Sequence, residues 1–274
     1  NTIKREKIEF DCVYSHFLWI SAMTAVRVGR KYNVPVFGAA GESTFEAFSG
    51  YEREEVIDYL NQMTGIVSVS SENKRILIEN HVLQDSKIRV FPNAVDTSRF
   101  TLQNKIEARN RFNIPKDSFV VAFVGHFIER KGPLRVEEAT KRAGVNVIFA
   151  GKGPQKPQGD NILFCDSIEP RDMPTFLNSA DAFVLPTQNE GCCNAIIEAM
   201  ACGLPIISSD REFNKDVLDS SCSILVDPEN VDELEKAIDK LHQDKEYCRL
   251  LSDGAVRRSS LLTIEKRAND IVTW

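Results

Sequence analysis

The sequence predicts an α/β protein built from two open, parallel β-sheets. Short apolar runs rich in Val, Ile and Phe alternate with helical patterns along the chain. Continuous apolar runs are expected of strands that are buried on both faces, and strand–helix alternation implies βαβ units around a parallel sheet. A polar segment near residues 93–102 separates the strands into two sets, so we expect two open α/β domains.

Each element follows from a local pattern of apolar residues. Strands are expected at residues 11–15, 34–39, 66–70 and 87–92, and in the second set at 119–124, 146–150, 161–164, 182–185, 205–208 and 223–226. Helices are expected at residues 19–32, 52–63, 72–80, 134–143, 174–179, 195–202, 231–243 and 247–252.

The domain boundaries follow from these two sets. We place the first domain at residues 1–96 and the second at 97–262, with residues 263–274 after it. The first set supplies about four strands, whereas a doubly wound domain usually has about five or six. The chain also opens without Met. We therefore expect an incomplete first domain; a naturally small first domain is the alternative.

Composition and charge exclude several classes of protein. The net charge of −6 argues against a protein whose affinity rests on many phosphate contacts along DNA. The apolar stretch at residues 17–26 is too short for a spanning helix, which needs about 20 residues, and residues 1–6 do not lead into the apolar region expected of a signal sequence. The 7 cysteines lack regular spacing, which is typical of reduced thiols in a cytoplasmic protein. Cys192 and Cys193 have no second pair at zinc spacing, so we expect no metal site.

Residues 180–210 form the most informative stretch of the sequence. A buried strand ends before Pro186, a polar turn carries Glu190 and Gly191, and a helix follows, with Asn194 expected as its N-cap. Ligands of open α/β sheets bind at the carboxyl ends of the strands, and a helix N-terminus suits phosphate. The helix dipole contributes only about 0.3–1 kcal/mol, so we expect a cation to assist.

Two glutamates flank the start of this helix. Glu190 lies in the turn and Glu198 one turn inside the helix, so the two carboxylates could contact different parts of one extended ligand. A carboxylate can accept hydrogen bonds from two vicinal hydroxyls, such as those of a ribose. An exposed loop charge and a solvated helix face are the alternatives. Apolar neighbours on both sides of Glu198 disfavour a fully solvated face.

Two further glycine turns follow buried strands. Residues 121–132 read V-A-F-V-G-H-F-I-E-R-K-G, and residues 147–154 read V-I-F-A-G-K-G-P. Glycine permits a close approach of the backbone to a ligand, although a plain tight turn is the alternative. Neither domain opens with G-x-G-x-x-G, which disfavours a nicotinamide dehydrogenase.

Taken together, these segments resemble the retaining GT-B glycosyltransferases of glycosyltransferase family 4. Residues 190–205 match the longest motif of the family. This motif has a Glu-Gly turn, two glutamates separated by seven residues, and an E-A-M-A-x-G-x-P sequence that begins at the second glutamate. Its G-x-x-x-x-x-K-G and A-G-x-G-P turns match residues 125–132 and 150–154. The P-N-A-V-D sequence at 92–96 resembles the family's interdomain segment. The resemblance covers nearly the whole chain.

The resemblance implies a GT-B fold of two Rossmann-like domains, with the nucleotide-sugar donor on the second and the acceptor largely on the first. It also implies a last helix, at residues 263–274, that crosses back to the first domain. It implies that Lys131 contacts the donor diphosphate, that Glu198 holds the ribose and that Glu190 holds the transferred sugar. Lys131 and Glu190 are therefore the candidate catalytic residues. No metal or other cofactor is implied, because Lys131 and the helix terminus would stabilise the leaving diphosphate.

Main-chain groups complete the implied donor site. The resemblance implies that backbone N–H groups bind the sugar or the phosphates. These groups belong to Gly191, Cys192, Cys193 and Asn194. The loop around Ile168 is implied to face the base. The family usually has Arg where this chain has His126. We hypothesise that protonated His126 attracts the diphosphate, so that donor affinity strengthens toward pH 6. The same pH dependence in wild type and His126→Arg would contradict this; a neutral His with an ordinary hydrogen bond is the alternative.

The acceptor side departs further from the family pattern. Glu42 lies where many relatives carry a histidine, and His16 resembles a family histidine that lines the cleft, although a buried structural histidine is the alternative.

The expected function is transfer of a sugar from a UDP- or GDP-sugar to a glycan or lipid-linked acceptor in polysaccharide or glycoconjugate biosynthesis. Peripheral membrane contact would come through the first domain, and no nucleic acid is expected as a partner. The alternatives are a module that binds nucleotide sugar without transfer, and another GT-B enzyme such as a nucleotide-sugar epimerase. The spacing of Glu190 and Glu198 favours transfer.

Overall fold

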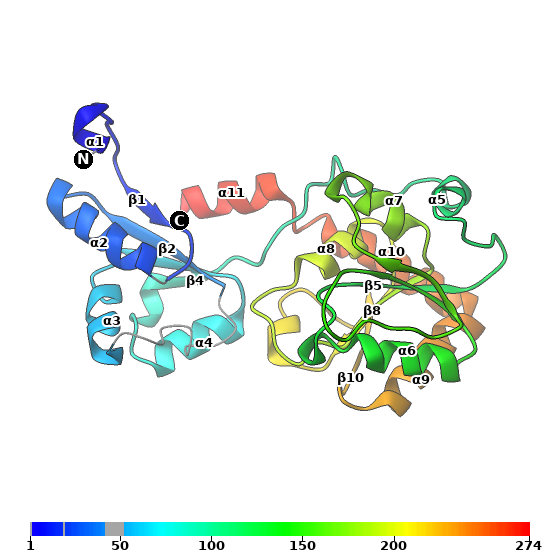
Figure 1. The fold of residues 1–274 in the computed structure, drawn as a ribbon. Helices are drawn as coiled ribbons and strands as arrows, with labels where there is room; N and C mark the ends of the chain where they lie inside the picture. The colour runs from blue at the N-terminus through cyan, green and yellow to red at the C-terminus, as the bar shows by residue number, and fades with distance from the viewer. Residues whose placement is uncertain (1, 19, 42–51) are drawn as a thin grey trace. The chain divides into compact units, whose positions relative to one another are not determined.

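The computed structural model describes residues 2–18, 20–41 and 52–274, and it divides into two compact units, Asn1–Pro92 and Asn93–Trp274. Each unit has a wholly parallel sheet with helices between its strands (Figure 1). The α/β class with parallel sheets is therefore confirmed.

The first unit contains a four-stranded sheet in the order β1-β2-β3-β4. Its strands are β1 (Val13–Ser15), β2 (Val36–Ala40), β3 (Gly65–Ser68) and β4 (Ile88–Val90). Its described helices are α1 (Thr2–Arg5), α2 (Ile20–Tyr32), α3 (Arg53–Leu60), α4 (Ser71–Glu79) and the 3₁₀ turn η2 (Asp85–Lys87). The core of this unit lies between α2, α3 and the sheet, around Val26, Leu60 and Ile66.

The second unit contains a six-stranded sheet in the order β10-β9-β8-β5-β6-β7. Its strands are β5 (Val120–Val124), β6 (Asn146–Ala150), β7 (Ile162–Asp166), β8 (Ala182–Leu185), β9 (Ile206–Ser209) and β10 (Ser223–Val226). The central strands are buried on both faces, which explains their uninterrupted apolar sequences. Phe123, Phe149 and Phe183 have no exposed surface, and burying each one contributes about 1.5–3 kcal/mol.

Helices cover both faces of this second sheet. Helices α6 (Pro133–Arg142) and α9 (Val231–Gln243) pack together on one face, and α8 (Asn194–Ala201) packs against α10 (Lys245–Ser259) on the other (Figure 1). The unit also contains α5 (Lys105–Arg111), α7 (Met173–Asn178), α11 (Ile264–Thr273) and the 3₁₀ turns η3 (Glu129–Lys131), η4 (Pro170–Asp172) and η5 (Glu212–Asn214).

The strand order places a topological switch point between β5 and β8. From β5 the chain adds β6 and then β7 on one side, and the later strands β8, β9 and β10 extend the sheet on the other. Loops that leave β5 and β8 at their carboxyl ends therefore diverge and leave a crevice, the usual ligand position in such sheets.

The two ends of the second unit are joined by backbone hydrogen bonds. Val95 N–H donates to Leu262 O at 2.9 Å, and Ile264 N–H donates to Val95 O at 3.3 Å, so Val95 and Thr263 form a parallel bridge. The bridge fixes the start of α11 beside the boundary segment. The crossing of residues 263–274 to the first unit stays a prediction.

Helices α5 and α10 of the second unit differ from the sequence-based expectation, and α1 of the first unit was not expected. The apolar pattern predicts no helix at residues 105–111, but they form α5, whose N-terminus is capped because Asn104 accepts hydrogen bonds from Ile106 N and Glu107 N. Helix α10 does not end at residue 252 but continues to Ser259. Gly254 lies inside it because a Cβ there would stand 1.7 Å from Ser221 O, so only glycine allows this close packing.

Candidate functional site

Two loops meet at the switch point of the second sheet. The loop after β5 carries Lys131, and the loop after β8 carries Glu190. Lys131 Nζ lies 2.5 Å from Glu190 Oε1, and the two side chains are only 13% and 14% exposed. The backbone joins the loops as well, because Gln188 N–H donates to Arg130 O at 2.9 Å. The fold thus brings together the cation and the carboxylate that the sequence places 59 positions apart.

Glu190 accepts three contacts on one oxygen. Besides Lys131, Arg130 Nη1 donates to Oε1 at 2.8 Å and Thr187 Oγ1 donates to it at 2.9 Å. Arg130 also donates to Asn189 O. The described contacts leave Oε2 without a partner, so this oxygen can accept a hydroxyl of a ligand. Two cations face one carboxylate, and the surplus positive charge suits a phosphate-bearing ligand.

The glycine turns after β5 and β6 lie against each other. Gly125 N–H donates to Ala150 O at 3.0 Å, and a Cβ at Gly151 would stand 1.9 Å from Gly125 O. Gly132, which follows Lys131, has φ +74° and starts α6. Glycine is required at both positions, at Gly151 by close approach and at Gly132 by the left-handed backbone. These turns form the wall of the site beside Lys131.

The N-terminus of α8 differs in one detail from the prediction. Cys193, not Asn194, is the N-cap, and its side chain makes no capping hydrogen bond. Asn194 is the first helical residue, and its Oδ1 instead accepts from Asn93 Nδ2 at 2.8 Å. The same amide nitrogen donates to Cys192 O at 3.0 Å. The expected cap fails because Asn93 holds the Asn194 side chain, and the first N–H groups of α8 keep their capacity to bind an anion.

The thiols of this turn are not activated. Burial raises the pKa of Cys192 to about 12 and raises that of Cys193 as well. Both side chains therefore stay neutral at pH 7, and they contribute shape and backbone N–H groups rather than thiolate chemistry. Gly191, at the start of the turn, is buried.

Glu198 lies one turn into α8 and is half-buried. Burial raises the pKa of its carboxyl, and the more distant charge of Arg99 lowers it only in part. No hydrogen bond or ion pair joins the Glu198 carboxylate to another described residue, whereas buried charges are normally paired. A ligand that donates hydroxyl hydrogen bonds would satisfy this group.

The remaining predicted residues lie around or away from this centre. Ile168 is half-buried and packs against the core, and the next loop residues are held by Arg99, whose Nη2 donates to Pro170 O at 2.9 Å. His126 is exposed at the start of the loop after β5. His16 is exposed in the first unit, where its ring packs edge-on against Phe17 at 4.4 Å, so it is not a buried structural histidine. Glu42 lies outside the described residues.

Sequence reasoning missed three residues that support the site. Arg130 precedes Lys131 directly, and Asn93 belongs to the P-N-A-V-D segment, so both were within motifs already singled out. Arg135 donates to Glu129 Oε1 at 2.7 Å and to Pro186 O at 3.1 Å, and its guanidinium lies against Gly132. From helix α6, Arg135 therefore connects the loop after β5 with the loop after β8. No local sequence pattern reveals this contact.

Residues 2–18, 20–41 and 52–274 contain neither a cluster of metal ligands nor a membrane span. No three His, Cys, Asp or Glu side chains gather there as metal ligands would. No helix in these ranges is long and apolar enough to cross a bilayer.

The model of the family described as "Glycosyl transferases group 1" matches residues 104–258, more than half of the chain. This chain belongs to that family. The match includes the loops that carry Lys131 and Glu190 and the helix that carries Glu198, so the family assignment and the geometry concern the same part of the molecule.

Individual relatives of this chain share less than 30% of their aligned residues with it. The chain is 23% identical over 300 residues to a D-inositol 3-phosphate glycosyltransferase of Stackebrandtia nassauensis, covering 96% of this chain and 67% of that protein. It is 28% identical over 201 residues to the UDP-Gal:alpha-D-GlcNAc-diphosphoundecaprenol alpha-1,3-galactosyltransferase of Escherichia coli, covering 66% and 52%. The chain thus spans between about half and two thirds of the length of these relatives.

The fold resembles that of solved glycosyltransferase structures. Anabaena Alr3699/HepE in complex with UDP superposes with a TM-score of 0.88 at 15% identity, covering 99% of this chain and 80% of that one. Such low identity supports the fold alone. With the family match, it confirms the expected GT-B fold.

Proposed function

We propose that this chain is a retaining glycosyltransferase of family 4 that transfers a sugar from a UDP- or GDP-sugar to a glycan or lipid-linked acceptor. The observation that carries the proposal is the Lys131–Glu190 pair beside the uncapped start of α8, at the switch point of the sheet. The D-inositol 3-phosphate and galactosyl transferases among its relatives are compatible with such donors and acceptors.

Each group at the switch point has a role in this proposal. Lys131 and the first N–H groups of α8 bind the donor diphosphate, and Glu198 accepts two hydrogen bonds from the ribose hydroxyls. Glu190 Oε2 binds the sugar that is transferred, while its Oε1 stays with Arg130 and Thr187. The main chain near Ile168 faces the base, and the first unit, with His16 and Glu42, binds the acceptor and contacts the membrane surface peripherally.

The reaction breaks the bond between the anomeric carbon and the diphosphate oxygen and forms a bond to an acceptor oxygen. The acceptor proton leaves with the diphosphate or to solvent, so charge and atoms balance. Retention requires that the new bond forms on the face from which the diphosphate departs. Lys131 and the helix N-terminus stabilise the negative charge of the leaving diphosphate, and no metal is needed in this scheme.

Calorimetric titration of the chain with UDP, GDP and ADP in the presence of EDTA tests the donor site. We expect micromolar binding of one nucleotide, and Lys131→Ala should weaken it about 10–150-fold, as expected from the loss of a charged hydrogen bond. The matched variant Lys141→Ala, on the exposed side of α6, should change it less than about twofold. No binding of any nucleotide, or equal effects of the two variants, would refute the donor site.

Transfer is tested separately, by NMR analysis of the product formed from the corresponding nucleotide sugar and candidate acceptors. A product with inverted anomeric configuration would contradict the retaining mechanism. Nucleotide-sugar binding with no transfer to any acceptor would instead favour a binding module.

A further inference from the structure

A second cavity lies at the other end of the strands that carry the candidate donor loops. It has a volume of about 760 Å³, and its floor consists of the residues that precede β5, β8 and β9, including Phe119, Ala180 and Pro205. A strand of four to five residues is about 15 Å long, so this amino-edge cavity is separate from the switch point. Its size is typical of small-molecule sites, which occupy about 300–1,000 Å³.

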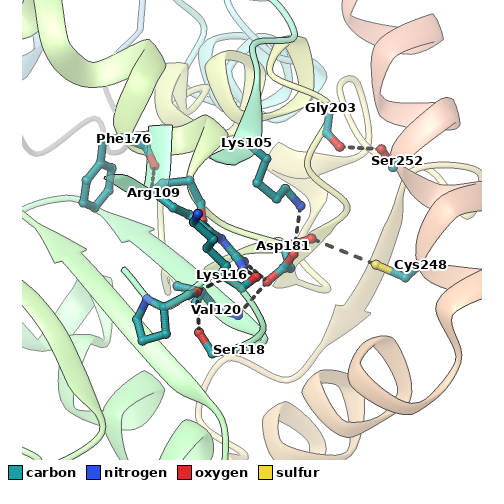
Figure 2. Close-up of polar contacts among 12 residues, drawn as sticks. Lys105, Arg109, Lys116, Ser118, Val120, Phe176, Asp181, Gly203, Cys248 and Ser252 are labelled. Atoms are coloured by element: carbon teal, nitrogen blue, oxygen red, sulfur yellow. Dashed lines mark hydrogen bonds and ion pairs between the residues drawn. The ribbon is translucent and has the colours of Figure 1, made fainter. Parts of the chain in front are cut away.

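Two helices form the walls of the amino-edge cavity. Helix α5 contributes Lys105 and Arg109, which are four positions apart on one face. Helix α10 contributes Lys245, Cys248, Arg249 and Ser252, whose spacing of three, four and seven positions also defines a single face. Figure 2 shows Lys105, Arg109 and Asp181 converging opposite Cys248 and Ser252. Neither wall presents the apolar stripe that helices normally direct inward.

The charge of the cavity is strongly asymmetric. Five Lys and Arg side chains line it against two carboxylates, although the chain as a whole has a net charge of −6. One of these carboxylates is already neutralised, because Asp181 binds Lys105 at 2.8 Å and Arg109 at 2.6 Å and also accepts from Val120 N–H at 2.7 Å. The other, Asp117, is exposed on the loop before β5.

Two of the cations have no described carboxylate partner. Arg109 is committed to Asp181 and to backbone carbonyls, and Arg249 pairs with Glu246 and Asp253 along its own helix. Lys116 and Lys245 are exposed, and no ion pair within the described part of the chain includes either of them. Lys105 adds a second cation to the carboxylate of Asp181. The cavity therefore carries more positive than negative charge, and an external anion would balance the excess.

We propose that the amino-edge cavity binds a small phosphate ester, such as a sugar phosphate or a nucleoside monophosphate. The phosphate accepts from Lys116 and Lys245, with Lys105 as a third cation. The sugar or nucleoside lies over the apolar floor formed by Phe119, Leu204 and Leu241. The site does not depend on the proposed transfer reaction, since none of its residues belongs to the loops at the switch point.

The proposal is tested by calorimetric titration of the whole chain with ribose 5-phosphate and AMP, and with ribose and adenosine as uncharged controls. At least one phosphate ester should bind, and its uncharged counterpart should not. The double variant Lys116→Gln/Lys245→Gln should weaken binding about tenfold or more. Lys141→Gln/Lys236→Gln removes the same charge from exposed positions of α6 and α9 and should leave affinity within about twofold. Lys131→Ala, in the donor loop, should also leave it unchanged.

A second measurement locates the bound ester without relying on affinity. Cys248 is half-buried in the cavity wall, so the bound ester should slow its alkylation by iodoacetamide, while the exposed Cys12 of the first unit should react at an unchanged rate. Failure of both esters to bind, equal loss of binding in the two double variants, loss in Lys131→Ala, or an unprotected Cys248 would each overturn the proposal.

Discussion

Replacing Glu190 by glutamine is expected to strengthen the binding of a nucleoside diphosphate while it lowers transfer. In the structure Glu190 Oε1 forms an ion pair with Lys131 Nζ at 2.5 Å, so the carboxylate competes with a diphosphate for the same ammonium group. A phosphate oxygen at about 2.8 Å from Nζ, placed tetrahedrally, would lie about 4 Å from Glu190 Oε1. Two unit charges at that separation repel by about 4 kcal/mol at an effective dielectric constant of about 20.

The observed gain should be smaller, because Arg130 compensates part of the charge of Glu190. We expect the affinity for the nucleoside diphosphate to rise about tenfold in Glu190→Gln, measured by calorimetry at low ionic strength and again at about 0.15 M salt. Glutamine keeps an oxygen that can accept from Lys131, Arg130 and Thr187, so the loop should keep its conformation. Transfer should fall, since Glu190 is the group proposed nearest the reacting sugar.

Glu138→Gln provides the matched control for this substitution. Glu138 is an exposed carboxylate on α6 that pairs with Arg142, and its loss removes the same charge away from the loops. Its effect on diphosphate affinity should be less than about twofold. Unchanged or weaker diphosphate binding in Glu190→Gln, with an unaltered unfolding temperature, would refute the competition for Lys131.

Three further predictions concern the groups that support the site. Burial raises the pKa of Glu198, so its charged form destabilises the fold; Glu198→Gln should raise Tm at pH 8 but hardly at pH 4, and equal effects at the two pH values would contradict the burial. Asn93→Ala removes two hydrogen bonds, a loss of roughly 1–3 kcal/mol, and should lower both Tm and diphosphate affinity; a lower Tm with unaltered affinity would restrict Asn93 to a structural role. Arg135→Leu should weaken diphosphate binding more than Arg142→Leu, and titration of both variants decides whether Arg135 holds the two loops together.

Much of the fold could be predicted because local patterns and burial agree. Each strand expected from the sequence is present with ends that differ by at most two residues, since strands buried on both faces have unbroken apolar sequences. Helix α5 was missed because its stability is tertiary. Five of its seven residues are polar, and Arg109 is buried only because Asp181 and several carbonyls satisfy its guanidinium.

The candidate site was predictable in its residue types but not in its connections. The strand–turn–helix pattern predicts that Glu190 and Glu198 flank the start of α8, and the structure places them there. That Lys131 pairs with Glu190, and that Asn93 takes the side chain of Asn194 away from capping, depends on contacts between segments distant in sequence. Such contacts leave no periodic signal, so only coordinates reveal them.

The bridge between Val95 and Thr263 has a consequence for how this part of the chain could be exchanged. Because the two residues are hydrogen-bonded neighbours, the segment between them begins and ends at the same place on its surface. A segment with adjacent ends can be excised, circularly permuted or inserted into another protein without stretching its flanks. Chimaeras cut at these two positions should therefore fold, and they offer a direct way to move the proposed donor site between members of the family.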